Sequence, residues 1–398
     1  MRLHFEDEDF DGQLQRGVSY APYGLADLGE AMATAERIAS EDRDSWYSEW
    51  FATGELARTA AEESRGDGHR ESARLAFLRA SNWFRMAEFY VRDSDEDGRS
   101  TRAFRAAQDA FAAALQLFTT PAEAVRIPYE DRTLPGYVFA PDDSGGPHPT
   151  LIAFGGQDAL IGELWGAVVA AALARGYAVV AFDGPGQGEV LRVDGVAFRP
   201  DWEAVVTPAV DFAVARPEVD PGRLATIGRS FGGYLAPRAV SGEPRIAALV
   251  ADPGQFDFGE PAAAQVPEEL RAKVLAGDPS VDPVLDQVLS HPQRGFFLKA
   301  RMRAFGVTHV REMIGAMQGY TLRDVAGQIR CPTLVCDNEH DPIGGGQARQ
   351  LYDALPGPRK DYVRFTGAEG AAGHCEGMAQ TVFHRRAFDW LDGVLRTG

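Results

Sequence analysis

The chain has 398 residues, of which 45% are hydrophobic and 25% charged, a composition typical of a folded protein with one large or two modest domains. Its formal net charge of −18 disfavours nucleic acids and anionic membranes as partners, because both would repel it. The three cysteines, Cys331, Cys336 and Cys375, form no C-x-x-C pair. They argue against a zinc knuckle or a disulfide framework and fit a reducing compartment.

No segment of the sequence is typical of membrane insertion or export. No apolar run approaches the roughly 18 residues that cross a bilayer. The N-terminal stretch, Met-Arg-Leu-His-Phe-Glu-Asp-Glu-Asp, lacks the basic and apolar regions of a signal peptide. We therefore expect a soluble, cytoplasmic protein.

Residues 1–122 have the pattern of a helical domain. Residues 26–118 are rich in alanine, glutamate, arginine and aromatic residues, and residues 73–90 contain neither glycine nor proline. Apolar residues recur there every three or four positions, and residues 45–51 and 101–118 follow the same pattern. The sequence predicts an all-α N-terminal domain of four or five helices, whose aromatic side chains pack mainly between the helices.

From Pro121 onward, strands alternate with helices. Residues 125–130 and 134–140 resemble an antiparallel pair, and the short apolar runs that follow are typical of strands buried on both faces of a parallel sheet. This alternation predicts an α/β core over residues 123–398, with a mostly parallel doubly wound sheet and a helical insertion at about residues 254–325. The predicted buried strands are 150–154, 178–182, 224–227, 247–250, 333–336 and 362–365, and the predicted helices are 160–175, 202–215, 347–355 and 378–395.

A G-x-S-x-G motif centred on Ser230 follows directly after the predicted strand at 224–227. A sharp strand-to-helix turn at this point pushes a serine hydroxyl out of the sheet as a nucleophile. We expect glycine at Ser−2 and Ser+2, Gly228 and Gly232, because the backbone there leaves no room for a Cβ. Pro237 is expected to be tolerated only in the first turn of the following helix. We predict a catalytic Ser230, and a purely structural turn is the alternative.

A nucleophilic serine needs a histidine base that follows it late in the chain. Of the later histidines, His374 lies in the glycine-rich segment 367–377, between the final predicted strand and the final predicted helix. A loop at the carboxyl end of a strand can present an imidazole to the serine. His384 falls inside a predicted helix and is interpreted as a surface or packing residue, so we predict His374 as the base.

The acid that orients the histidine should follow the preceding strand. The segment after Cys336 offers Asp337, Glu339 and Asp341. Asp337 is close enough to the strand to be its terminator, whereas Asp341 precedes Pro342, where the loop should turn back toward the histidine. We predict Asp341 as the acid, with Glu339 as the runner-up.

The oxyanion that forms on attack needs two backbone N–H donors. The first is expected from Phe231, the residue after the nucleophile, and the second from Gly156 or Gln157 in the loop after the strand at 150–154. A plain tight turn is the alternative for that loop.

The glycine-rich segment 183–189 could be mistaken for a phosphate-binding loop. It lacks G-x-G-x-x-G spacing and a G-K-[ST] motif, and Pro185 removes an N–H donor. We interpret it as a structural loop beside the active site. Without an H-E-x-x-H or comparable ligand spacing, we expect no metal and no cofactor.

Four segments together resemble the α/β-hydrolase superfamily, and within it the branch of 2,6-dihydroxypseudooxynicotine hydrolase, fungal polyketide-shortening hydrolases and FrsA-like proteins. The segments are residues 227–233 (IGRSFGG), 182–189 (FDGPGQGE), 329–335 (IRCPTLV) and 369–375 (EGAAGHC). The helical part before residue 122 resembles that branch's cap domain. By position, the resemblance implies Ser230 as nucleophile, Asp341 as acid and His374 as base. It also implies a cap over the carboxyl edge of the sheet and, commonly, a homodimer.

The sequence and this resemblance predict a serine hydrolase that acts on a small carbonyl substrate through an acyl-enzyme. The preferred reading is carbon–carbon cleavage of a β-diketone or aryl ketone, with an aromatic or polyketide-like substrate under the cap. This bond type follows from the resemblance alone. The alternatives are a carboxylesterase, thioesterase or acyltransferase with the same residues and, in another class, an inert FrsA-like binding or regulatory protein.

Overall fold

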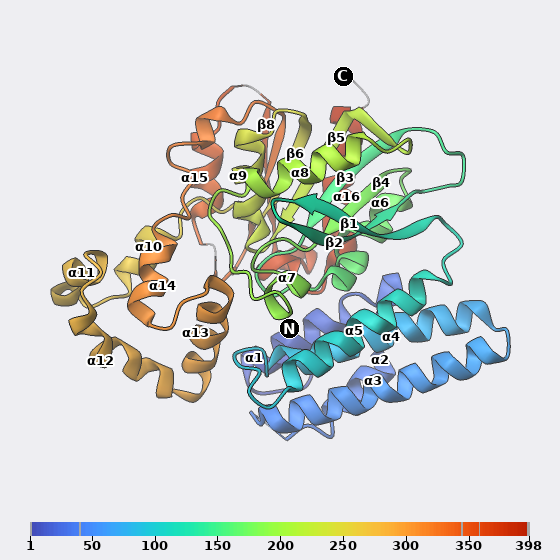
Figure 1. Cartoon of the computed structure of the whole chain (residues 1–398), viewed down its shortest axis with the longest axis horizontal. Coiled ribbons are helices and arrows are strands. Elements are labelled where there is room, and N and C mark those ends of the chain that lie inside the picture. Colours follow the sequence, from blue (N-terminus) through green and yellow to red (C-terminus); the bar gives the residue numbers. More distant parts are fainter. Residues whose placement is uncertain (1, 40, 344, 358, 396–398) are drawn as a thin grey trace.

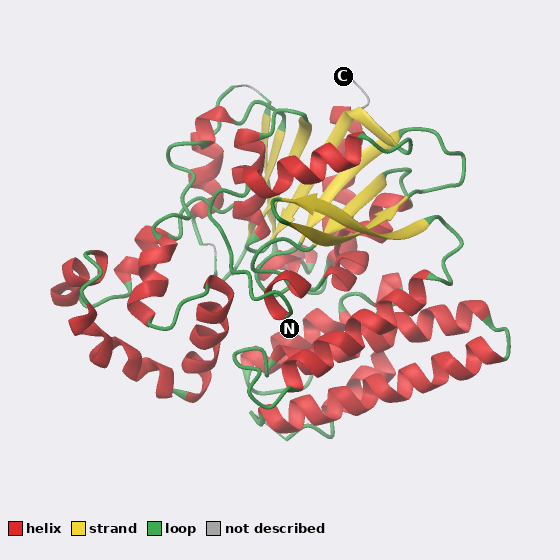
Figure 2. Ribbon diagram, viewed as in Figure 1, coloured by secondary structure: helices red, strands yellow, loops and turns green. Residues whose placement is uncertain are grey.

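A single sheet of eight strands organises the chain (Figure 2). The computed structural model describes residues 2–39, 41–343, 345–357 and 359–395. The strand order is β1-β2-β4-β3-β5-β6-β7-β8, with antiparallel pairing of β1 with β2 and β2 with β4 and parallel pairing elsewhere. The strands are β1 Ala122–Tyr129, β2 Arg132–Phe139, β3 His148–Phe154, β4 Ala178–Phe182, β5 Val219–Arg229, β6 Ile246–Asp252, β7 Thr333–Asn338 and β8 Lys360–Phe365. The predicted mostly parallel sheet is confirmed.

Helices cover both faces of the sheet, which explains why its central strands are continuous apolar runs. Strand β4 is buried at every position, and β6 at all but one. Side chains of α8 (Glu203–Val214), α9 (Gly232–Gly242) and α15 (Gln347–Ala354) belong to the hydrophobic core on one face. Those of α6 (Ala170–Leu173) and α16 (Gln380–Leu395) belong to the core on the other (Figure 1).

Five helices precede the sheet and lie beside it (Figure 1). They are α1 Glu8–Val18, α2 Leu28–Ala35, α3 Arg43–Gly66, α4 Arg70–Phe89 and α5 Arg99–Leu115. Large aromatic side chains fill the space between them, and the rings of Trp50 and Trp83 stack with centroids 5.1 Å apart. These aromatic residues form helix–helix core, as the sequence pattern indicates.

A second helical segment lies between β6 and β7 and forms a separate lobe in Figure 1. It contains α10 Gly259–Ala264, α11 Glu268–Leu275, α12 Asp282–Leu285, α13 Pro292–Phe305 and α14 Val310–Met317. Phe296 of α13 packs against Tyr90, which follows α4, with ring centroids 5.5 Å apart. The inserted helices therefore contact the N-terminal helices as well as the sheet core. Among the described residues, no helix is both long and apolar enough to cross a membrane.

Two helix predictions differ from the structure. The predicted helix at 160–175 is a 3-10 turn (Ile161–Glu163), a π-helical stretch (Trp165–Val169) and the short α6. Gly162 and Gly166 pack there against Phe111 and Tyr20 of the N-terminal segment, with no room for a Cβ without adjustment. Pro237 lies in the second turn of α9 rather than the first. It is accommodated because the carbonyl of Gly233, which a proline cannot satisfy, accepts a hydrogen bond from the Gln255 N–H at 3.3 Å.

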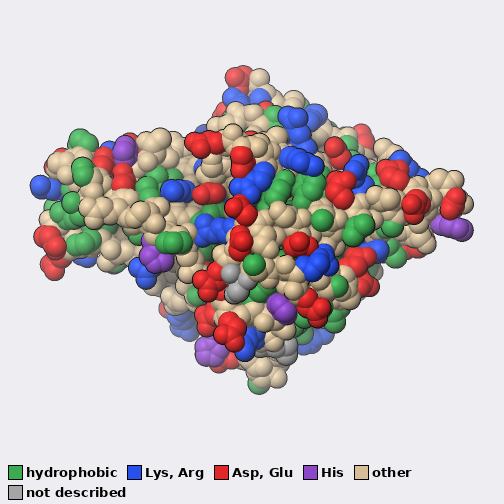
Figure 3. Space-filling model, turned by 90° about the horizontal axis from the view of Figure 1, so that it is seen from below, with side chains coloured by type: hydrophobic (Ala, Val, Ile, Leu, Met, Phe, Trp, Pro, Cys, Tyr) green, Lys and Arg blue, Asp and Glu red, His purple; other side chains and the backbone are tan. Residues whose placement is uncertain are grey.

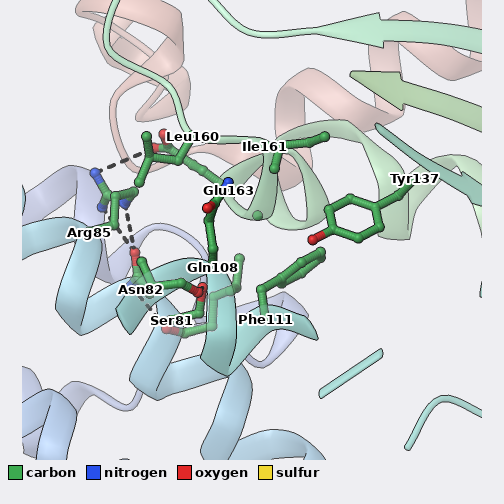
Figure 4. Close-up of a pocket in the computed structure, with 12 residues that line it drawn as sticks. Ser81, Asn82, Arg85, Gln108, Phe111, Tyr137, Leu160, Ile161 and Glu163 are labelled. Carbon is green, nitrogen blue, oxygen red and sulfur yellow. Dashed lines mark hydrogen bonds and ion pairs between the residues drawn. The ribbon is translucent and has the colours of Figure 1, made fainter. Parts of the chain in front are cut away.

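A buried ion cluster joins the N-terminal helices to the core. Both carboxylate oxygens of Glu163 accept hydrogen bonds from Arg16 at 2.7 Å, and Arg85 of α4 lies 3.6 Å from the same carboxylate. Figure 4 shows Arg85 beside Asn82 in a small pocket that Glu163 also lines. Burial alone would raise the pKa of Glu163, but Arg16 and Arg85 outweigh it and lower the pKa to about 2.

We expect Glu163→Gln to lower the free energy of unfolding by about 3–5 kcal/mol, because Arg16 and Arg85 would remain buried without a counter-charge. Glu62→Gln, which removes an exposed ion pair with Arg65, is the matched control and should change it by less than about 1 kcal/mol. Urea unfolding followed by circular dichroism measures both. The stabilisation from Glu163 should be fully present above pH 4.5 and be lost as the pH falls toward 2. Equal effects of the two substitutions would contradict this account.

Candidate active site

Ser230 occupies a strained turn between the end of β5 and the start of α9. Its φ is +58°, a left-handed conformation that is uncommon for residues other than glycine. Its N–H donates to the carbonyl of Asp252 at 2.8 Å, which fixes the turn against the end of β6. A Cβ at Gly228 or at Gly233 would lie 2.0 Å from a backbone oxygen, whereas Gly232 has ordinary room. The second tight position is thus Gly233, not the predicted Gly232.

The structure brings the side chains of Ser230, His374 and Asp341 together. The Ser230 Oγ lies 2.8 Å from Nε2 of His374, and Nδ1 of His374 lies 3.1 Å from both carboxylate oxygens of Asp341. His374 comes from the loop between β8 and α16, and Asp341 from the loop after β7. Because parallel strands end at the same edge of a sheet, these three loops meet there.

Other candidates from the sequence lie elsewhere. Glu339 does not contact His374; its carboxylate accepts the Gly367 N–H and its carbonyl accepts the Gly373 N–H, both at 2.7 Å, so it braces the histidine loop. His384 is buried in the core, where it bonds the Tyr23 hydroxyl and the Ala167 carbonyl. His384 is therefore a packing residue.

The surroundings of His374 favour its protonated form. Burial opposes the charge, but the neighbouring Cys375 sulfur and the Asp341 carboxylate outweigh burial and raise the pKa of His374 well above its usual value. An imidazole held in this way between a hydroxyl and a carboxylate can accept a proton from Ser230 and hold it as an imidazolium.

The loop after β3 lies directly against the Ser230 turn. A Cβ on Gly156 would be 3.0 Å from the Ser230 Cβ and 3.1 Å from the Phe231 nitrogen. Gln187, from the glycine-rich segment after β4, is fully buried and donates from Nε2 to the carbonyls of Gly155 at 2.5 Å and Gly156 at 3.3 Å. The segment interpreted as a structural loop therefore holds the loop that contains the predicted oxyanion donors Gly156 and Gln157.

Arg229, the residue before Ser230, connects the serine turn to the histidine loop. Its guanidinium donates to the Asp252 carboxylate, to the Cys375 carbonyl and to the Glu376 carboxylate, each at 2.8 Å, and to Gln380 at 2.5 Å. Cys375 and Glu376 directly follow His374 and both have positive φ, at +51° and +58°. The buried Arg229 guanidinium thus fixes the backbone next to His374. The sequence alone does not reveal this role, because the side-chain partners of Arg229 lie 23–151 residues further along the chain.

Glu376 is a buried carboxyl that is poised to be neutral. Burial and the adjacent Asp252 carboxylate raise its pKa well above the usual value, although Arg229 opposes them. Its Oε1 also accepts a hydrogen bond from Asn338 at 2.8 Å. The Arg229 guanidinium therefore contacts both the Asp252 carboxylate and a Glu376 carboxyl group whose protonated form is favoured. Among the described residues, no group of three or more histidine, cysteine, aspartate or glutamate side chains could hold a metal ion.

The chain is similar to known hydrolases. A family model described as "Alpha/beta hydrolase family" matches residues 145–382. Hydrolase LUC6 from Fusarium sp is 33% identical over 410 residues, with 98% of both chains covered. The 20-hydroxy-prefusarin hydrolase FUS2 from Gibberella moniliformis is also 33% identical, with 99% of this chain and 98% of that protein covered. Among solved structures, 2,6-dihydroxy-pseudo-oxynicotine hydrolase has a TM-score of 0.77 at 21% identity and covers 95% of both chains.

The raised pKa of Glu376 predicts unequal effects of two conservative substitutions in the Arg229 cluster. Glu376→Gln replaces a neutral acid by a neutral amide of similar shape and should lower the free energy of unfolding by less than about 1 kcal/mol. Asp252→Asn removes the carboxylate that pairs with Nε of Arg229 and should lower it by about 3–5 kcal/mol. Urea titrations at neutral pH measure both. A larger loss for Glu376→Gln would show that Glu376 is the ionised partner instead.

Proposed function

Because the chain belongs to the alpha/beta hydrolase family and is a hydrolase, we propose that Ser230 is its nucleophile, His374 its general base and Asp341 the acid that orients the histidine. The observation that carries this proposal is the unbroken chain of contacts from the Ser230 Oγ through both ring nitrogens of His374 to Asp341. The strained backbone at Ser230 supports it as well, because strain of this kind clusters at functional turns.

The reaction follows from these positions. Nε2 of His374 accepts the Ser230 proton as Oγ attacks the substrate carbonyl, and the tetrahedral oxyanion receives hydrogen bonds from the N–H of Phe231 and of Gly156 or Gln157. His374 then gives its proton to the leaving group as the bond to the carbonyl carbon breaks. Water, deprotonated by His374, attacks the resulting acyl-enzyme and releases a carboxylic acid and free Ser230.

For the substrate, we favour a β-diketone or aryl ketone whose carbon–carbon bond is cleaved. The leaving carbon departs as an enolate, which the adjacent carbonyl stabilises, and His374 protonates it. The aromatic surroundings of Phe231 support an apolar carbonyl compound: the rings of Phe198, Phe305 and Tyr320 lie 5.1–5.9 Å from it. The choice of bond type follows from the family resemblance of the sequence motifs.

The same residues could cleave an ester or thioester, or transfer an acyl group. An inert binding protein of FrsA-like type would not need the Ser230–His374 contact of 2.8 Å, which counts against that reading. We further propose a cap domain over residues 1–122, a hydrolase core over 123–398 with an insertion at about 254–325, and a cytoplasmic homodimer that acts on a small molecule.

Ser230→Ala tests the proposed nucleophile. Turnover should fall by about 10⁴-fold or more, because the acyl-enzyme cannot form. A fluorophosphonate probe should label wild-type protein at Ser230 and leave the variant unlabelled. Ser241→Ala on α9, where the hydroxyl only donates to the Arg238 carbonyl, is the matched control and should retain activity within about twofold. Residual Ser230→Ala activity above roughly one hundredth of wild type would rule out this mechanism.

A pair of substrates tests the bond type. Wild-type protein should convert benzoylacetone into a ketone and a carboxylic acid, measured by liquid chromatography. Rapid hydrolysis of p-nitrophenyl acetate without cleavage of benzoylacetone would instead establish an esterase with the same catalytic residues.

The pKa of His374 predicts the acid limb of the pH profile. His374 must be neutral to accept the serine proton, so kcat/KM should fall as the pH drops through a pKa above the usual 6.5. Cys375→Ser removes one cause of that elevation and should move the limb to lower pH. An acid limb at or below 6.5 in wild-type protein would contradict the proposed environment of the base.

A further inference from the structure

A pocket lies where the N-terminal helices, the core and the inserted helices meet. Arg92 follows α4, Arg192 ends α7 (Gly188–Arg192), and Arg303 lies on α13; all three line it together with Gln157 and Asp158 from the loop after β3. Its interior volume is about 10 Å³, enough for one water-sized group. Gln157 is one of the two residues proposed as the second oxyanion donor. The pocket therefore adjoins the proposed site of reaction.

The charges around this pocket do not balance. Arg192 pairs with both oxygens of buried Glu88 at 2.8 and 3.1 Å, and Arg92 pairs with Asp158 at 3.1 Å. Burial would raise the pKa of Asp158, but Arg92, Arg16, Arg301 and Arg192 outweigh it and keep the pKa low. The guanidinium groups at this junction are Arg92, Arg192, Arg301 and Arg303, and the carboxylates are Glu88 and Asp158.

Among the described residues, neither Arg301 nor Arg303 forms an ion pair of its own, although Asp158 acts electrostatically on Arg301. Arg301 has a buried Nε that makes no hydrogen bond within the described part of the chain, and burial lowers its pKa. Arg303 donates only to the Arg92 carbonyl at 3.1 Å and to the Ser100 hydroxyl at 3.4 Å. A buried guanidinium nitrogen without a hydrogen-bond partner costs free energy, so an anion that is not part of the chain would stabilise the Arg301 Nε.

The positive charge of this arginine cluster is opposite in sign to the net charge of the whole protein. The chain carries 58 acidic and 40 basic residues, and acidic and basic side chains are interspersed over the surface seen in Figure 3. Solvated surface ion pairs of this kind contribute little to the free energy of folding. An excess of guanidinium groups inside an acidic protein, next to its proposed reaction site, is a specific feature.

We propose that this pocket binds a carboxylate of the substrate, so that the hydrolase acts on a carbonyl compound that also carries an acidic group. The proposal rests on the proposed function for its link to catalysis. Gly156 packs against Ser230, and Asp158 follows it by two residues, within about 8 Å along the backbone. A carboxylate in this pocket, which Gln157 and Asp158 line, would therefore lie close to the carbonyl that Ser230 attacks. The planar fork of arginine suits such a group.

Matched ligands test this site directly. Calorimetry should detect binding of glutarate, whereas its neutral dimethyl ester should bind at least about tenfold more weakly. Arg301→Gln and Arg303→Gln should each weaken glutarate binding by about tenfold or more, and Arg301→Lys should weaken it less than Arg301→Gln, because the positive charge remains while the planar fork is lost. Arg294→Gln, at an exposed position of α13, is the control and should bind glutarate as wild type does.

Kinetics and labelling separate this proposal from the proposed function. The kcat/KM of wild-type protein for p-nitrophenyl hydrogen glutarate should exceed that for its methyl ester, and the ratio should fall toward one in Arg301→Gln. Glutarate should also slow fluorophosphonate labelling of Ser230. Labelling without any preference for carboxylates, in binding or kinetics, would overturn the anion site alone. Selective glutarate binding that is lost in Arg301→Gln, in a protein that is never labelled, would support the anion site and overturn the hydrolase mechanism.

Discussion

One buried guanidinium, that of Arg229, holds the candidate active site in its geometry. Ser230 and the residues after His374 adopt left-handed backbone conformations that ordinary side chains resist. Such conformations persist only where the surroundings over-determine them. Arg229 does so by joining the end of β6, through Asp252, to the carbonyl and side chain of the two residues after His374. The Ser230–His374 distance is therefore a property of this ion cluster as much as of the two residues themselves.

Charge is distributed in a second, larger pattern. Glu163 neutralises guanidinium groups from two N-terminal helices and so fixes these helices to the core. A short distance along the same loop, Asp158 faces more positive charge than it can balance. The two ends of this loop thus have different roles. Glu163 joins the N-terminal helices to the core, and Asp158 lines the proposed anion pocket beside the proposed oxyanion donors. Buried ion pairs contribute specificity of arrangement more reliably than net stability.

The sheet, its strand directions and the meeting of Ser230, His374 and Asp341 could be predicted because parallel strands end at one edge and the chain order restricts the candidates. The hydrolase family and fold were predicted from four short motifs, and both are confirmed. What sequence reasoning missed depends on partners distant in the chain. Gln187 acts by holding the neighbouring loop, and Pro237 is tolerated because Gln255 bonds the carbonyl that the proline leaves free. The helix at 160–175 is broken where N-terminal side chains pack on Gly162 and Gly166.

The left-handed backbone at Ser230 also has an evolutionary consequence. Glycine adopts a φ of +58° freely, whereas serine pays about 1 kcal/mol or more for it. A glycine at position 230 would therefore relax the turn but remove the hydroxyl of the proposed nucleophile. Selection for stability alone would favour that change. The proposed nucleophile thus lies where the backbone is less stable than the fold permits.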